Sequence, residues 1–233
     1  MQRTIKDNIY EIRGRIEEAA LRSGRDPSDI CLITVSKTRS AEEIDIAAGC
    51  GITDIGENKV QEILAKKPYV SSDIRWHLIG HLQTNKVKSV IDKVDVIHSV
   101  DSIHLAEEID KRAAQAGIIK DVLLQVNVAE EPQKFGFSMG DAKIAAADIL
   151  RQFEHVKIRG LMQIAPYAED PEDVRIYFRQ LHDLYLRLKE STLPDADMLS
   201  MGMSGDFEIA VEEGATHIRV GTAIFGERDY NKK

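Results

Sequence analysis

Two kinds of hydrophobic pattern alternate along the chain. Short apolar runs rich in β-branched residues, which are typical of buried strands, occur at 31–36, 52–56, 75–80, 94–100, 121–128, 156–164, 198–203 and 217–226. Between most of these runs, apolar residues recur three or four positions apart, as expected for helices with one buried face. Strands that alternate with helices indicate a parallel sheet, and nearly continuous apolar strands indicate a sheet covered on both faces.

A helical pattern precedes the first strand. Its apolar stripe consists of Ile5, Ile9, Ile12 and Ile16. Gly24 and Pro27 are expected to end this helix, which we place within residues 1–24.

The number of strands sets the fold class. Eight strands in 233 residues predict an α/β fold, a single (β/α)8 TIM barrel over residues 31–226 with the additional N-terminal helix, all in one domain of residues 1–233. An open, doubly wound sheet is the alternative, but neither GxGxxG nor GxxxxGK[ST] occurs in the chain.

Composition narrows the possible partners. The net charge of −8 argues against general binding to nucleic acid or to anionic membranes. Two cysteines without a CxxC pair favour a reducing compartment. The first twenty residues are too charged for a signal peptide, and no apolar segment approaches the ~20 residues of a membrane helix. We therefore expect a soluble, cytoplasmic protein with no nucleic-acid or membrane partner.

A lysine directly follows the first strand. In a barrel, chemistry takes place at the C-terminal ends of the strands, which puts Lys37 at the mouth. A solvated lysine, an anion-binding lysine and a Schiff-base lysine whose amine loses its proton beside Arg39 are all compatible with this position. Lys37 alone does not choose among them.

Two glycine-containing turns follow strands seven and eight. Ser204 and Gly205 begin one turn, and Gly221 and Thr222 form the other. Bare backbone N–H groups and hydroxyls in such turns attract phosphate, and barrels often bind phosphate after these two strands. Ser204 is also a natural N-cap for the helix that follows, an interpretation that requires no ligand.

Three further polar residues are expected near the mouth. Arg219 shares a strand face with Gly221 and points into the barrel, toward a ligand or a core carboxylate. Asn58 follows strand two as a ligand to a hydroxyl or carbonyl, or as a helix cap. His81 lies past the end of strand three and faces the site, whereas His77 is expected in the core. The two histidines lack a third ligand at suitable spacing, so no metal site is predicted.

These candidates fit one ligand. A lysine, a phosphate cradle and an inward arginine suit an aldehyde that carries a phosphate, and pyridoxal 5′-phosphate (PLP) is the obvious cofactor of this kind.

The motifs also resemble a known family. VSKTR (35–39), IGENKVQE (55–62), WHLIGHLQTNK (76–86) and the segment 199–226 resemble the YggS/PROSC family of pyridoxal phosphate homeostasis proteins. The resemblance implies a single barrel similar to the N-terminal domain of alanine racemase, a fold type III enzyme. It implies that Lys37 forms the Schiff base, that Ser204, Gly205, Gly221 and Thr222 hold the phosphate, that Arg219 faces the pyridine nitrogen and that Asn58 lies near the ring hydroxyl.

The resemblance further implies a function. We expect a monomeric, non-catalytic PLP carrier that regulates vitamin B6 and amino-acid pools, with PLP-dependent apoenzymes as candidate acceptors and without catalytic residues. The alternative is an amino-acid racemase, which needs a second base opposite Lys37. Tyr167 and His81 are the candidates for that base, and no C-terminal domain is expected to supply another. A barrel enzyme for an unrelated phosphorylated substrate is a third possibility, and whether Lys134 is a second loading site stays open.

Overall fold

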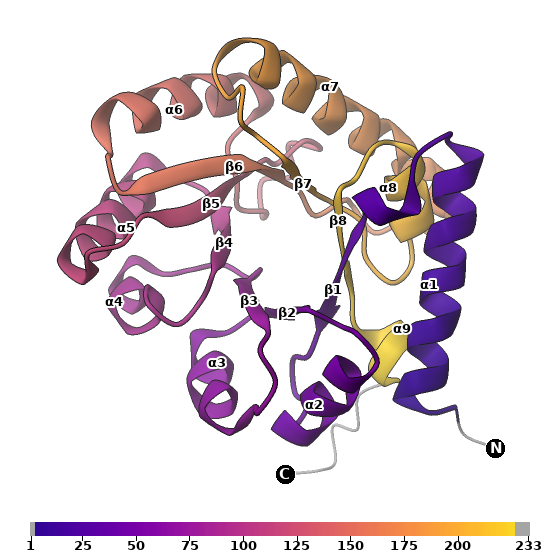
Figure 1. Cartoon of the computed structure of the whole chain (residues 1–233). Coiled ribbons are helices and arrows are strands. Elements are labelled where there is room, and N and C mark those ends of the chain that lie inside the picture. The colour runs from indigo at the N-terminus through magenta and orange to yellow at the C-terminus, as the bar shows by residue number, and fades with distance from the viewer. Residues whose placement is uncertain (1–2, 227–233) are drawn as a thin grey trace.

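Eight parallel strands form a closed barrel in the computed structural model, which describes residues 3–226. The strands follow one another around the ring in chain order, and β1 pairs with both β2 and β8, which closes the sheet (Figure 1). The predicted TIM barrel is confirmed, and the open sheet is wrong. Residues 1–2 and 227–233, which belong to the predicted domain range, lie outside the described residues.

Every strand overlaps a predicted run. The strands are β1 Cys31–Val35, β2 Asp54–Glu57, β3 Arg75–Leu78, β4 Val96–Val100, β5 Lys120–Gln125, β6 Val156–Met162, β7 Met198–Ser200 and β8 His217–Val220. The predicted run 217–226 is too long, because the chain turns at Gly221. The carbonyl of Gly221 accepts hydrogen bonds from the backbone N–H groups of Ile224 and Phe225, each 2.9 Å long, and a short helix replaces the end of the run.

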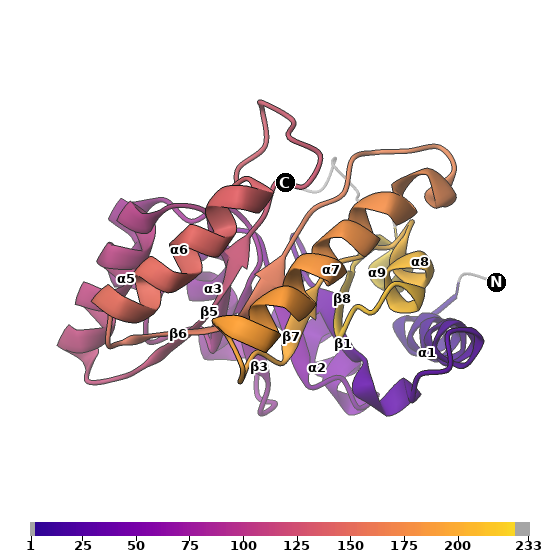
Figure 2. The same cartoon turned by 90° about the horizontal axis from the view of Figure 1, so that it is seen from above.

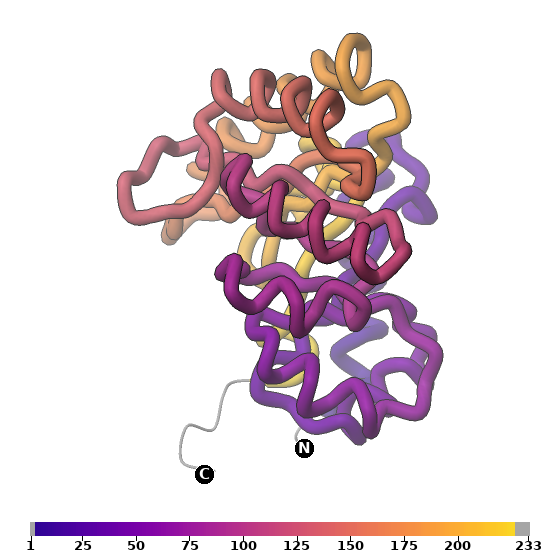
Figure 3. Tube along the Cα trace, turned by 90° about the vertical axis from the view of Figure 1, so that its left-hand side faces the viewer, coloured from indigo at the N-terminus to yellow at the C-terminus, as the bar shows by residue number. Residues whose placement is uncertain are grey.

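The helices cover the outside of the barrel. They are α1 Ile5–Arg22, α2 Ala41–Gly49, α3 Val60–Lys66, α4 Val87–Val90, α5 Ile103–Ala116, α6 Met139–Gln152, α7 Arg175–Ser191, α8 Phe207–Glu212 and α9 Thr222–Phe225. Short 3-10 turns occur at Pro27–Asp29, Lys67–Tyr69, Thr84–Lys86 and Pro171–Val174. Figure 3 shows α3 to α6 stacked one beside the next over the sheet, as successive βα units require.

The N-terminal helix packs on the far end of the chain. Thr4 and Asp7 form a capping box at the start of α1, and its buried stripe of Ile9, Ile12 and Ile16 faces inward. The helix contacts α8 and α9 (Figure 1), and the Asn8 side chain donates to the carbonyl of Ile224 over 2.7 Å. Helix α1 therefore supports the turn after β8.

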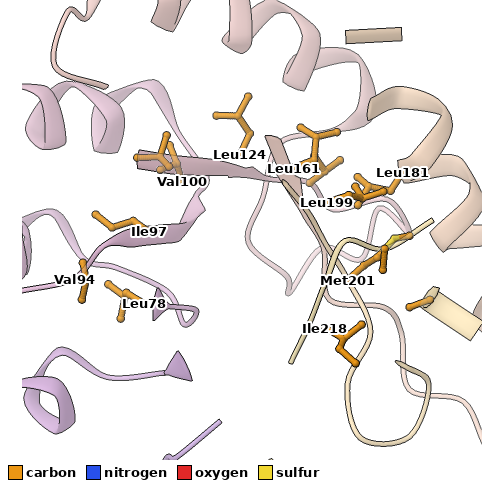
Figure 4. Close-up of a cluster of buried hydrophobic side chains, with 14 of the residues drawn as sticks. Leu78, Val94, Ile97, Val100, Leu124, Leu161, Leu181, Leu199, Met201 and Ile218 are labelled. Carbon is orange, nitrogen blue, oxygen red and sulfur yellow. The ribbon is translucent and has the colours of Figure 1, made fainter. Parts of the chain in front are cut away.

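The main core lies between the barrel and its helices. Figure 4 shows Leu161 of β6 and Leu199 of β7 beside Leu181 of α7 in this layer, and all three side chains are fully buried. A smaller apolar cluster of Val96, Leu123, Met162 and Met198 is separate from it.

Long loops project at one end of the barrel. Figure 2 shows the segments after β5 and after β6 extending on the same side. Within residues 3–226, no helix combines the length and apolar character that crossing a membrane requires.

Candidate functional site

A cavity of about 240 Å³ lies at the C-terminal ends of the strands. Seven of the eight predicted site residues line it: Lys37, Asn58, Ser204, Gly205, Arg219, Gly221 and Thr222. Barrel enzymes place their ligands at this end, so this cavity is the candidate site. A larger cavity of about 840 Å³ includes Arg13, Asp54 and His217 and lies at the opposite ends of the strands.

Apolar residues complete the wall of the site. Val35, Ile79, Ile164 and Met203 line the cavity beside the polar groups, and sequence reasoning missed them. Ile79 and Ile164 come directly after β3 and shortly after β6, so their position at strand ends was the available signal. Together they form an apolar wall suited to a flat organic ligand.

The backbone around Lys37 is held on both sides. The carbonyl of Ser36 accepts a hydrogen bond from Lys66 Nζ over 2.8 Å, and the N–H of Thr38 donates to the Glu62 carboxylate over 2.6 Å. Thr38 has a φ of 67°, a left-handed conformation that is unfavourable for a β-branched residue. These contacts from α3 fix the direction in which Lys37 leaves the end of β1.

A buried carboxylate lies beneath this segment. Glu57 is fully buried, and one of its oxygens accepts from Ser36 Oγ over 2.6 Å and from Lys66 Nζ over 2.7 Å. Burial raises the pKa of Glu57, although the hydrogen bond from the Lys66 ammonium opposes the rise. Lys66 therefore compensates a charge that would otherwise be costly to bury.

Ser204 joins the two glycine-containing turns. Its predicted role as an N-cap is wrong, because α8 begins at Phe207 and Asp206 occupies the N-cap position. The Ser204 hydroxyl instead accepts from the backbone N–H groups of Gly221 and Ala223, over 3.3 and 3.5 Å. The turns after β7 and β8 therefore meet, as the strand count predicted.

The two glycines of these turns have different surroundings. A Cβ atom on Gly221 would lie 3.0 Å from the Val35 carbonyl oxygen, which is closer than side chains normally approach. A Cβ atom on Gly205 would meet nothing within 4 Å. Packing against β1 crowds position 221, whereas Gly205 leaves open space beside the cavity.

Arg219 points inward, as predicted. The side chain is only 4% exposed, and it donates to Ser200 Oγ over 2.6 Å and to the Gln163 carbonyl over 2.7 Å. Burial lowers the pKa of Arg219 to about 10, so the guanidinium remains charged at neutral pH. The described hydrogen bonds of Arg219 thus go to neutral acceptors and not to a core carboxylate, which was the alternative to a ligand.

Asn58 is not a helix cap. Helix α3 begins at Val60 with Lys59 as its N-cap, and no side chain caps it. The Oδ1 atom of Asn58 is buried and has no hydrogen-bond partner among the described residues. A Cβ atom on Gly80 would lie 2.3 Å from the Asn58 carbonyl oxygen, so glycine there allows the close approach that positions Asn58. This buried acceptor in the cavity wall is available to a donor group of a ligand.

His81 lies outside the wall of this cavity. Its Nδ1 is 3.0 Å from an Asp101 carboxylate oxygen, and its ring stacks on Phe135 with centroids 3.7 Å apart. It lines a different groove, together with Asp101 and Leu105.

His77 belongs to the core, as predicted, with both ring nitrogens hydrogen-bonded and no exposed surface. Among the residues that the structure describes, no group of three or more His, Cys, Asp or Glu side chains is arranged to hold a metal ion.

Known proteins share both the sequence and the fold. The sequence profile of the alanine racemase N-terminal domain matches residues 8–229. The pyridoxal phosphate homeostasis protein of Aquifex aeolicus is 45% identical over 225 residues, which cover 96% of this chain and 98% of that protein. The Escherichia coli K12 protein of the same name is 37% identical over 235 residues, covering 98% and 99%.

A solved structure with a ligand is also similar. PipY of Synechococcus elongatus PCC7942, solved with PLP bound, superposes with a TM-score of 0.78 at 40% identity, covering 92% of this chain and all of that one. With matches that span nearly the whole of both chains, this chain belongs to the family of pyridoxal phosphate homeostasis proteins.

Proposed function

We propose that this protein binds PLP and serves as a non-catalytic carrier in vitamin B6 homeostasis and amino-acid balance. The observation that carries the proposal is one cavity that gathers Lys37, two turns rich in backbone donors, Arg219 and an unpaired acceptor on Asn58. The 40% identical PipY, solved with PLP bound, supports the same ligand.

The residues present suit each part of the cofactor. Asn58 Oδ1 would accept a hydrogen bond from the ring hydroxyl, which would satisfy an atom that residues 3–226 leave without a donor. Ser204, Gly205, Gly221 and Thr222 would surround the phosphate, with open space at Gly205 for its approach. Arg219 would face the pyridine nitrogen from inside the barrel.

Lys37 would hold the cofactor covalently. Its amine, once unprotonated, would be the nucleophile that holds the aldehyde group of the cofactor. The contacts of Ser36 and Thr38 with α3 hold the backbone on either side of Lys37 in place. When bound, the cofactor supplies an electrophilic carbon and an electron-withdrawing ring.

Borohydride reduction followed by mass spectrometry tests this role. We expect one PLP adduct, on Lys37, and we expect Lys37→Ala protein to purify without visible absorption by the cofactor. Lys59→Ala is the matched control, because Lys59 is an exposed lysine at the N-cap of α3 beside Asn58. Unchanged absorption in Lys37→Ala would show that Lys37 does not hold the cofactor.

The same mass spectra test whether Lys134 also forms an adduct with PLP. Its Nζ pairs with Glu131 and donates to the Ala165 carbonyl over 3.1 Å, so these contacts must break before it can react. We expect no adduct on Lys134 at an equimolar amount of PLP.

The surroundings of the site favour a carrier over a racemase. Arg219 stays charged and donates hydrogen bonds only, so it disfavours a protonated pyridine and weakens the ring as an electron sink. Tyr167, one candidate for the second base, is 93% exposed, and His81 lines a different groove. Loss of a positioned general base typically costs a factor of ~10²–10⁴ in rate.

Exchange of the α-proton tests this distinction. We expect deuterium incorporation and racemisation of amino acids far below ordinary enzyme rates, as measured by NMR and chiral chromatography. Alanine racemase assayed in parallel is the positive control. Turnover of about 1 s⁻¹ or faster would establish the racemase instead.

A carrier role also implies transfer of PLP to other proteins. A carrier passes its cofactor to PLP-dependent apoenzymes, and we place the protein in the cytoplasm, where those acceptors are made. Transfer is measured as activity gained by an apoenzyme mixed with the loaded protein, compared with the same amount of free PLP.

A further inference from the structure

A continuous row of hydrogen bonds crosses the inside of the barrel. It begins at Arg219 in the cavity wall and continues through Ser200, His98 and His77 to Asp54. The successive distances from Arg219 to Asp54 are 2.6, 3.0, 2.9 and 2.8 Å. Asp54 lines the larger cavity at the opposite ends of the strands, so the row joins the two ends of the barrel.

The two ends of the row determine its direction. A guanidinium only donates hydrogen bonds and a carboxylate only accepts them. Burial by itself would raise the pKa of Asp54, but hydrogen bonds from His77 and Thr53 outweigh it and hold that pKa below its usual range. Asp54 is therefore an acceptor at neutral pH, and Arg75 also pairs with it over 2.8 Å.

These two ends then determine which atom of Ser200, His98 and His77 carries each hydrogen-bonding proton. Ser200 accepts from Arg219, so its own hydroxyl proton is available to His98 Nδ1. His98 carries its proton on Nε2 and donates it to His77 Nδ1, and His77 donates its Nε2 proton to Asp54. Burial, together with the charged guanidinium of Arg219, lowers the pKa of His98 well below its usual value, which agrees with a neutral ring.

The opposite arrangement leaves a group unsatisfied. If His77 were protonated on both nitrogens, His98 would have to donate from Nδ1 to Ser200. The Ser200 hydroxyl would then receive two donors and have no described acceptor for its own proton. Unpaired polar groups are costly in a buried site, so the first arrangement is favoured.

We propose that Asp54, from the far end of the barrel, positions Arg219 for the cofactor through this oriented row. The inference rests on the proposed function, because it concerns the guanidinium that would face the pyridine nitrogen. Asp54, His77, His98 and Ser200 are positioning residues in this scheme, and all four are buried with exposures of 0 or 1%. By linkage, a change at Asp54 alters how strongly the pyridine nitrogen is bound.

The first test requires no cofactor. Nitrogen-15 NMR of histidine-labelled wild-type protein, assigned with His77→Gln and His98→Gln variants, should show both rings neutral with the proton on Nε2. An Nδ1–H tautomer or an imidazolium at either position at neutral pH would overturn the proposal. This result stands whether or not the protein binds PLP.

The second test compares PLP with its deaza analogue, in which C–H replaces the ring nitrogen. Asp54→Asn should weaken PLP binding roughly five-fold or more, the lower end of measured couplings between sites, and should change binding of the analogue less than two-fold. Asp95→Asn is the control, because Asp95 accepts from the Trp76 N–H at the same end of the barrel and is outside the row.

The outcomes separate the two proposals. Equal losses for both ligands in folded Asp54→Asn protein would overturn the positioning role, whereas wild-type protein that binds neither ligand would overturn the proposed function. If Asp54→Asn does not fold, Ser200→Ala provides the same comparison, and equal losses there would likewise overturn the positioning role.

Discussion

At the scale of single residues, the site depends on a glycine, Gly221, in the turn after β8. Gly221 packs so closely on β1 that a Cβ atom would lie 3.0 Å from the carbonyl oxygen of Val35 and 3.1 Å from its Cβ. Its backbone N–H meanwhile points to the Ser204 hydroxyl. The position therefore combines a packing requirement with a place in the proposed phosphate site.

Gly221→Asp separates these two contributions when it is compared with Gly221→Ala. Both variants add the crowded Cβ atom, which we expect to destabilise the fold by about 1–3 kcal/mol. Only the aspartate adds a negative charge that repels a phosphate dianion. In equilibrium dialysis, Gly221→Asp should therefore lose more PLP than Gly221→Ala, while both retain pyridoxal, which has no phosphate, to a similar extent. Parallel losses of PLP and pyridoxal would argue against a phosphate at this turn.

At the scale of elements, α3 holds the end of β1. Lys66, in the last turn of the helix, donates to the Ser36 carbonyl, to buried Glu57 and, over 2.7 Å, to Glu62. Glu62 in turn accepts from the Thr38 N–H. One ammonium thus balances two carboxylates and fixes the segment that carries the proposed Schiff-base lysine.

Lys66→Met tests how much this ammonium contributes to stability. It leaves the buried carboxylate of Glu57 uncompensated, which we expect to cost about 3–5 kcal/mol of unfolding free energy near pH 8. The pKa of Glu57 is already raised by burial and should rise further without Lys66. A carboxyl whose folded-state pKa is raised contributes stability at pH below its unfolded-state pKa, and this contribution is lost as pH rises through the folded-state value.

The loss in Lys66→Met should therefore be smaller at pH 5 than at pH 8. Glu62 acts in the same direction. Burial alone would raise the pKa of Glu62, but hydrogen bonds from Lys66 and Thr38 outweigh burial and lower it. The ionised Glu62 carboxylate therefore contributes stability only at higher pH. Urea unfolding at the two pH values measures the difference. Lys88→Met, at an exposed position of α4, is the control. A loss independent of pH would mean that Lys66 contributes packing rather than charge compensation.

At the scale of the whole molecule, closure of the barrel creates the site. The pairing of β1 with β8 places Ile33 opposite Arg219 and Thr34 opposite Val220. Lys37 and the Gly221 turn are therefore neighbours, although most of the chain separates them. Closure also leaves the barrel of residues 3–226 without an open sheet edge at which a second chain could add a strand.

We expect the protein to be a monomer in solution. A closed sheet and a net charge of −8 both disfavour self-association. Size-exclusion chromatography with light scattering should give the mass of one chain over a wide range of concentrations, with and without PLP. A stable mass of two chains would contradict this expectation.

The sequence by itself determined which residues lie at the ends of the strands. Short, nearly continuous apolar runs mark the strands, and Lys37 and Asn58 come just after such runs, so their place at the mouth follows from the parallel order alone. The inward direction of Arg219 followed from the two-residue period of a strand. Resemblance to the family then assigned each residue a part of the cofactor.

Only the tertiary structure decided which groups meet across the barrel. It showed that Ser204 bridges to the turn after β8 rather than capping α8, and that His81 lines a different groove. It also revealed the row from Arg219 to Asp54, whose members come from five different strands. Local periodicity tells which face of a strand a residue occupies, but its partner depends on the register and closure of the whole sheet, which no local pattern contains.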